Sequence, residues 1–173
     1  GLAQAPAPFT AAQADAGRAA YAANCMSCHQ PNLAGEGDAL PLAGKTFIAA
    51  WGKRSTADLY NTIHNSMPYG RPGSLDAKTY SSIAAFILQA NGAKPGTAEL
   101  TPTTAVTIST IASGTVPADI QQGVKRAAPA RTTRSGDSME GAMARDADNG
   151  AGMIRSFGQT VVGDIKNYEP VTD

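Results

Sequence analysis

The chain has 173 residues, and its 14 basic and 14 acidic side chains give a formal net charge of zero at neutral pH. This length leaves room for one domain with a long appendage, and the balanced charge argues against a nucleic-acid-binding protein. We find no apolar run long enough to span a bilayer.

Residues 1–9 are predicted to form an extended lead-in. Pro6 and Pro8 disfavour helix in the residues that precede them. Residues 1–3, Gly-Leu-Ala, resemble the small-residue end of a signal peptide, with cleavage after Ala3. The lead-in is therefore expected to contribute no helix.

A first helix is predicted between Thr10 and Cys25. Thr10 and Gln13 have the spacing of a capping box at a helix start. In the alanine-rich run that follows, Gly17 and Tyr21 are four residues apart and share a face. A glycine inside a helix costs about 1 kcal/mol relative to alanine. Gly17 therefore indicates close approach by another helix, with a tolerated surface glycine as the alternative.

The pentapeptide Cys25-Met26-Ser27-Cys28-His29 is the attachment signature of a c-type haem. Each thiol adds across one vinyl group of the porphyrin, and one helical turn separates the two cysteines by the required distance. The histidine that follows lies beneath the ring and offers an imidazole nitrogen to the iron. This pattern predicts covalent haem c, with His29 as the proximal ligand.

Three other roles for these cysteines fit less well. A zinc site needs four ligands, usually with a second Cys/His pair at similar spacing. Beyond Cys25 and Cys28 the chain has only His29 and His64, and adjacent Cys28 and His29 would fit one tetrahedral ion poorly. A thioredoxin-like redox pair needs a βαβ context, whereas the residues before Cys25 are predicted to be helical. A plain disulfide leaves the adjacent histidine unexplained.

Residues 30–46 are predicted to be a loop, because proline and glycine recur through them. A metal-bound histidine usually donates its second ring N–H to a carbonyl or carboxylate. For His29 we expect that acceptor to be a backbone carbonyl near Leu40 or Pro41, in the segment that continues through Leu42.

Two helices are predicted between this loop and residue 66. Phe47, Ile48 and Trp51 indicate a short amphipathic turn or helix, in which Trp51 either borders the haem pocket or packs in the core. Thr56 is the expected cap of the next helix. That helix carries three apolar residues at helical spacing: Leu59, Tyr60 and Ile63.

Met67 is the candidate for the second axial ligand. It precedes proline in the rigid loop 67–73, and its thioether sulfur is a soft ligand that raises the reduction potential of haem iron when paired with histidine. A lone methionine is more often core filler, but this loop is an unusual place for filler. The rival ligands are His64, Met26, Met139, Met143 and Met153.

The clearest helix is predicted between Asp76, as its N-cap, and Gly92, just beyond its end. Its apolar stripe has the helical period and comprises Tyr80, Ile83, Ala84, Ile87 and Leu88. We expect Ile83 and Phe86 to cross the first helix near Gly17.

Residues 94–160 are predicted to be a linker rich in Pro, Gly, Ser and Thr, because they show no sustained hydrophobic period. The patch at 103–111 suits an extended segment docked on a partner. If the linker is ordered, we expect most of its contacts to lie on another domain or chain. Four basic residues form a loose group whose default interpretation is solvation: Lys125, Arg126, Arg131 and Arg134.

Residues 10–92, with the pentapeptide, the Leu42 loop and the Met67-Pro68 loop, resemble a class I cytochrome c domain. The resemblance implies an all-α fold around one covalently bound haem in residues 10–93, with His29 and Met67 as axial ligands. The family usually has a proline whose carbonyl accepts the proximal histidine N–H. Leu40 occupies that position here, which keeps the carbonyl and restrains the backbone less.

A closer resemblance is to the cytochrome domains of PQQ-dependent quinohaemoprotein alcohol dehydrogenases, carried by residues 65–75 and 87–92. Residues 162–173 are similar to the lead-in of their β-propeller, so 161–173 are expected to lead into a dehydrogenase. This resemblance implies that PQQ and calcium belong to the partner domain only. It also implies electron transfer from PQQ to this haem and on to an external cytochrome, quinone or copper protein.

We therefore expect a bacterial periplasmic one-electron carrier that is not an enzyme on its own. A free-standing monohaem cytochrome c subunit serving another periplasmic oxidoreductase is the alternative. An enzyme with an open sixth position, such as a peroxidase-like or gas-binding haem, and an interaction module with a structural haem are the other classes. The expected cofactor-binding residues are Cys25, Cys28, His29, Leu40, Pro41, Leu42, Trp51, Tyr60 and Met67.

Overall fold

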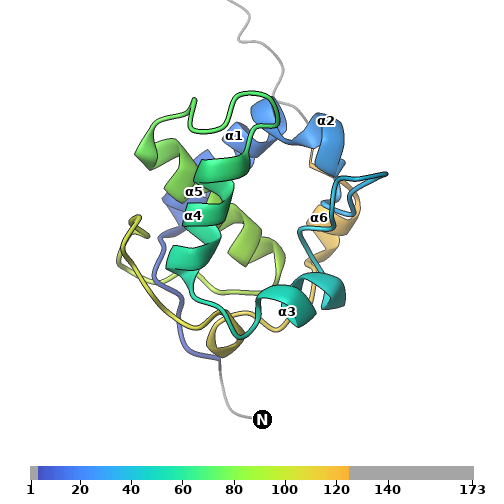
Figure 1. Cartoon of the computed structure of the whole chain (residues 1–173). Helices are drawn as coiled ribbons and strands as arrows, with labels where there is room; N and C mark the ends of the chain where they lie inside the picture. The colour runs from blue at the N-terminus through green and yellow to red at the C-terminus, as the bar shows by residue number, and fades with distance from the viewer. Residues whose placement is uncertain (1–3, 125–173) are drawn as a thin grey trace, which may run out of the picture. The chain divides into compact units, whose positions relative to one another are not determined.

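The structure, a computed structural model, describes residues 4–124, and this part of the chain is helical (Figure 1). Its elements in order are α1 (Ala11–Asn24), α2 (Met26–His29), α3 (Lys45–Trp51), α4 (Thr56–Ser66), α5 (Ala77–Ala90), the 3₁₀ helix η1 (Ile108–Thr110) and α6 (Ala118–Gln121). Among these residues the only β-pairing is two isolated bridges. The all-α prediction is confirmed. None of the helices in residues 4–124 combines the length and apolar character that crossing a membrane requires.

Helices α1 and α5 form the most extensive helix pair, and Gly17 is where their backbones meet. A Cβ atom at Gly17 would lie 1.8 Å from the carbonyl oxygen of Ser82, so no other residue fits without moving a helix. Beside this contact, the rings of Tyr21 and Phe86 pack with centroids 5.4 Å apart. The predicted crossing near Gly17 is confirmed for Phe86, whose Cβ would lie 2.9 Å from a Cβ at Gly17.

The start of α1 differs from the predicted capping box. Thr10 caps the helix by accepting a hydrogen bond from the backbone N–H of Gln13. The Gln13 side chain does not return to Thr10, however. It is buried and pairs with the backbone of Leu100, donating from Nε2 to the carbonyl and accepting from the N–H, both at 2.8 Å.

Helix α4 begins one residue earlier than predicted. Ser55 is the N-cap, and with Asp58 it forms a complete capping box. Thr56 is buried instead, and its hydroxyl donates to the carbonyl of Thr104. Ser55 and Thr56 are both favourable residue types for an N-cap. Ser55 takes the role because the Thr56 hydroxyl is engaged by the carbonyl of Thr104. The helix ends at Ser66, directly before Met67 as expected.

Helix α5 has the predicted ends. The side chain of Asp76 accepts a hydrogen bond from the backbone N–H of Thr79 at its start. Asn91 is the C-cap, and Gly92 follows with φ of 90°, a conformation that glycine adopts without the steric cost a Cβ atom brings.

Residues 94–124, which we call the strap, pack onto these helices (Figure 1). Residues of this stretch bury apolar side chains in the same core as α1 and α5: Leu100, Ile108, Ile111, Ala112, Ile120 and Val124. In residues 94–124 these contacts are made with the helical domain at 10–93. The N-terminal lead-in is hydrogen-bonded to the start of the strap. The Ala7 N–H donates to Lys94 O, and the Gly96 N–H donates to Phe9 O.

The strap is tied to the domain along its length. Hydrogen bonds join it to the start of α4 (Thr56 N–H to Val106 O), the end of α3 (Ser109 N–H to Gly52 O) and the loop after α2 (Val124 N–H to Pro31 O). An ion pair of 2.8 Å joins Arg18 of α1 to Asp119 of α6. Several predicted features lie outside the described residues. They are the segment 161–173 that was expected to lead into a dehydrogenase, residues 125–160 of the predicted linker with its four basic residues, and Met139, Met143 and Met153.

Candidate functional site

The two cysteines sit where α1 passes into α2. Cys25 is the C-cap of α1, and the backbone N–H groups of Cys28 and His29 both donate to its carbonyl, at 3.2 and 2.9 Å. Both thiols are free; Cys25 is half-buried and Cys28 is exposed. The sequence therefore folds into one helical turn that presents two unpaired thiols and an imidazole.

Electrostatics at Cys25 argue against a thiolate redox pair. Burial, and secondarily the nearby Cys28, raise the pKa of the Cys25 thiol to about 11, whereas reactive cysteines have lowered pKa values. Burial and then Cys25 also raise the pKa of Tyr21, whose hydroxyl donates to the carbonyl of Gln30 at 2.7 Å. Among residues 4–124, no three His, Cys, Asp or Glu side chains converge on a metal-sized site.

His29 is held by the acceptor that the sequence predicted. The ring is 8% exposed, and its Nδ1 lies 2.9 Å from the carbonyl oxygen of Leu40. Because Nδ1 is engaged, Nε2 is the nitrogen left for a metal. The Leu40 side chain is 71% exposed, so this residue acts through its carbonyl. Pro41 and Leu42 are half-buried, and Leu42 packs against the core.

Met67 follows α4 as its C-cap residue, and its N–H donates to Ile63 O at 2.9 Å. Its side chain is half-buried, and the peptide bond to Pro68 is cis. Figure 1 shows α2 and α4 on opposite sides of the region bordered by α3. His29 is the last residue of α2, and Met67 directly follows α4.

The rival ligands in this part of the chain are engaged elsewhere. The His64 ring stacks on Tyr60, with centroids 5.7 Å apart, and meets the edge of Tyr80. Its Nδ1 lies 2.9 Å from Oδ1 of Asn65. Met26 is partly buried against the core within the attachment turn.

Trp51 and Tyr60 occupy different environments. Tyr60 is buried, with 6% of its surface exposed, and belongs to the face of α4 that packs on α5. Trp51 is half-buried at the end of α3, stacked on Phe47 at 6.1 Å. The guanidinium of Arg54 lies 4.1 Å from the centre of the indole ring.

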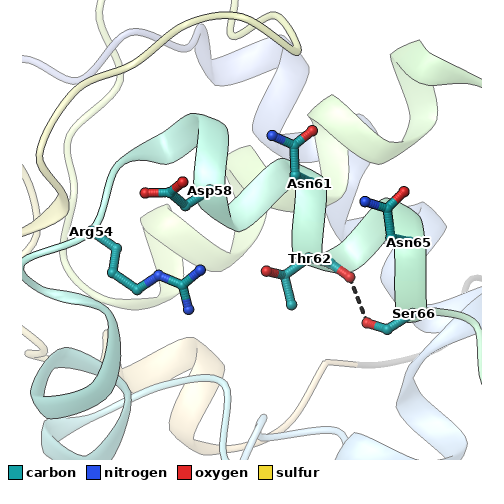
Figure 2. Close-up of a pocket in the computed structure, with 6 residues that line it drawn as sticks. All are labelled: Arg54, Asp58, Asn61, Thr62, Asn65 and Ser66. Atoms are coloured by element: carbon teal, nitrogen blue, oxygen red, sulfur yellow. Dashed lines mark hydrogen bonds between the residues drawn. The ribbon is translucent and has the colours of Figure 1, made fainter.

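Arg54 borders a pocket that the sequence did not indicate (Figure 2). The pocket has a volume of about 310 Å³ and is lined by polar residues: Arg54, Asp58, Asn61, Thr62, Asn65 and Ser66. Figure 2 shows Thr62 and Ser66 on the side of α4 toward which the Arg54 side chain extends, with the Ser66 hydroxyl bonded to Thr62 O. The signal in the sequence that could have indicated this pocket is a basic residue, Arg54, three positions after Trp51.

The donor set fits haem c. Two free thiols lie one turn apart, an imidazole is oriented through Nδ1, and a thioether directly follows α4. These are the groups that attach and ligate this cofactor.

Part of the chain matches a known protein family. Residues 12–87 match the family model described as "Cytochrome C oxidase, cbb3-type, subunit III". No curated protein matches the chain significantly. Among solved structures, the sulfane dehydrogenase SoxCD from Paracoccus pantotrophus is 18% identical, with a TM-score of 0.40 over 98% of this chain and 78% of that one.

The family match and the helical structure together show an all-α cytochrome c domain. A domain of this kind carries covalent haem c and transfers electrons.

Proposed function

We propose that this chain is a one-electron carrier whose haem is attached to Cys25 and Cys28 and ligated by His29 and Met67. The observation that carries the proposal is the turn 25–29, with two free thiols and an imidazole fixed at 2.9 Å to Leu40 O. When bound, haem c supplies a one-electron iron couple.

The residues of the chain would supply position and environment. Leu40 O holds the imidazole plane of His29, and the start of the Met67 loop is fixed by Ile63 O. Leu59 and Tyr60 bury their side chains on α4, the helix that Met67 follows. An apolar, dry surrounding and a thioether ligand both favour the reduced state and a high potential.

Haem attachment is tested by producing the chain in a bacterium that attaches haem c in its periplasm. We expect a mass increase of one haem that survives denaturation and maps to the peptide containing Cys25 and Cys28. Replacing both cysteines by serine should abolish it. A colourless wild-type protein would overturn the proposal.

The axial ligand is tested by comparing Met67→Ala with His64→Ala. Loss of the thioether should abolish the weak red charge-transfer band of the ferric protein. His64→Ala removes a rival ligand and should leave the band unchanged. An unaltered spectrum in Met67→Ala would exclude Met67 and reopen the enzyme class with an open sixth position.

We further propose a PQQ-dependent dehydrogenase as the electron donor, in the bacterial periplasm. The support is the resemblance of residues 65–75, 87–92 and 162–173 to quinohaemoprotein alcohol dehydrogenases. An appended domain would act at high effective concentration. PQQ and calcium would then belong to the dehydrogenase, and an external cytochrome, quinone or copper protein would accept the electrons.

The mass of the natural protein tests this pairing. A much larger polypeptide containing these residues supports a fusion, and stopped-flow mixing with an alcohol-loaded PQQ dehydrogenase should reduce the haem. A natural mass near that of this chain plus one haem, without such reduction, would favour the free-standing subunit.

A further inference from the structure

The side chain of Asn91 is fully buried at the end of α5, with every polar atom engaged. Its Nδ2 donates to Leu42 O at 2.9 Å and to Ile87 O at 2.8 Å. Its Oδ1 accepts from the N–H of Gly44 at 2.8 Å. One amide group therefore joins the last turn of α5 to two points of a loop 47–49 residues away in sequence.

The segment 40–44 that Asn91 holds is the one that orients His29. Leu40 O, two residues before Leu42, lies 2.9 Å from His29 Nδ1. The Leu42 N–H donates to Leu33 O at 2.8 Å. Gly44 O accepts from Ile48 N–H and so begins α3. Asn91 fixes the stretch between the Leu40 carbonyl and α3.

We propose that Asn91 is a positioning residue for His29, acting through Leu42, Gly44 and the Leu40 carbonyl. The inference rests on the proposed function, because the effect of Asn91 is measured at His29, the proposed proximal ligand of the haem. Leu40 stands where a proline would restrain the backbone in related domains, and its side chain is exposed. The hydrogen bonds of Asn91 replace part of the backbone restraint that a proline would supply and that Leu40 does not.

Gln13 provides a matched control, because it makes the same kind of contact elsewhere. It is a buried amide that pairs with both backbone groups of Leu100, at 2.8 Å each. It holds the strap and makes no contact with the segment 40–44 among its hydrogen bonds in the described residues. Gln13→Ala therefore reproduces the loss of stability without the loss of His29 positioning.

The test measures solvent exchange of the His29 Nδ1 proton by NMR in the reduced holoprotein, together with the reduction potential. In Asn91→Ala we expect exchange to be about tenfold faster, the effect of losing hydrogen bonds that restrain its acceptor. We expect the potential to rise, because a weaker Nδ1 hydrogen bond makes imidazole a less basic ligand. Gln13→Ala should change neither quantity.

Asn91→Leu is the second variant, since truncation to alanine risks poor folding. It keeps nearly the same side-chain shape and adds no charge, but it removes the donors to Leu42 O and Ile87 O and the acceptor for Gly44 N–H, so the same two changes are expected. Wild-type exchange or wild-type potential in both Asn91 variants would overturn the positioning role. Absence of haem from the wild-type protein would overturn the proposed function itself, and with it this inference.

Discussion

The hydroxyl of Tyr80 donates a 2.7 Å hydrogen bond to the carbonyl of Met67. The same hydroxyl accepts a longer bond, 3.4 Å, from the N–H of Leu75. One buried phenol on α5 thus holds both ends of the loop 67–75 that begins with the proposed axial methionine.

Replacing Tyr80 by phenylalanine should loosen this loop while preserving the core. We expect a loss of about 1 kcal/mol in the free energy of unfolding, the typical worth of one hydrogen bond, and a weaker methionine charge-transfer band in the ferric spectrum. Tyr21→Phe removes an equivalent 2.7 Å bond, to Gln30 O, and should lower stability without weakening the band. Equal bands in wild type and Tyr80→Phe would contradict this role.

Local patterns in the sequence predicted α1, α3, α4 and α5 and several of their ends, whereas η1 and α6 lie in residues that were predicted to be linker. The stripe of α5, its Asp76 cap and the stop at Gly92 are signals carried within one turn of the feature they specify. Gly17 was informative because a helix-destabilising residue needs a tertiary reason. The Leu40 carbonyl was predictable from the chemistry of a ligating histidine.

Contacts distant in sequence were not predictable in this way. Gln13 meets Leu100, 87 residues later, instead of completing its capping box. The strap buries isolated side chains such as Ile108 and Ile120 between prolines and glycines. Its sequence therefore lacks the hydrophobic period from which this packing could have been predicted. Nothing in the sequence around Asn91 indicated its hydrogen bonds to Leu42 and Gly44, 49 and 47 residues away. Haem attachment at Cys25 and Cys28 and iron ligation by His29 and Met67 remain predictions.

The strap should contribute directly to the stability of the cytochrome c domain. Ile108 is fully buried, so Ile108→Ala should lower the free energy of unfolding by about 2–5 kcal/mol, the range for truncating a buried isoleucine. Urea unfolding of the holoprotein measures it. Glu99→Ala, an exposed change in the same stretch, serves as the control. A loss below about 0.5 kcal/mol, as at a surface position, would show that the strap is dispensable.

Gly17→Ala should separate α1 from α5. The added Cβ would meet backbone, at 1.8 Å from Ser82 O and 2.4 Å from Ser82 C, and backbone cannot rotate away as a side chain can. We expect a loss of about 3 kcal/mol or more, at the upper end of overpacking effects, seen as a lower urea midpoint. Gly37→Ala, with open space around its Cβ position, should cost about 1–2 kcal/mol for its positive φ alone. Equal losses would contradict the close-packing account.

The cap of α5 should make stability depend on pH. The backbone N–H of Thr79 holds the pKa of the Asp76 carboxyl below its ordinary value. A carboxyl whose pKa is lower in the folded state stabilises the fold above its unfolded pKa, and this contribution is lost as pH falls through the folded pKa. Asn caps helices about as well as Asp but does not titrate. Asp76→Asn should therefore lose less stability than wild type when urea unfolding is followed from about pH 7 to about pH 3. Parallel stability curves for the two proteins would show that the cap contributes no pH dependence.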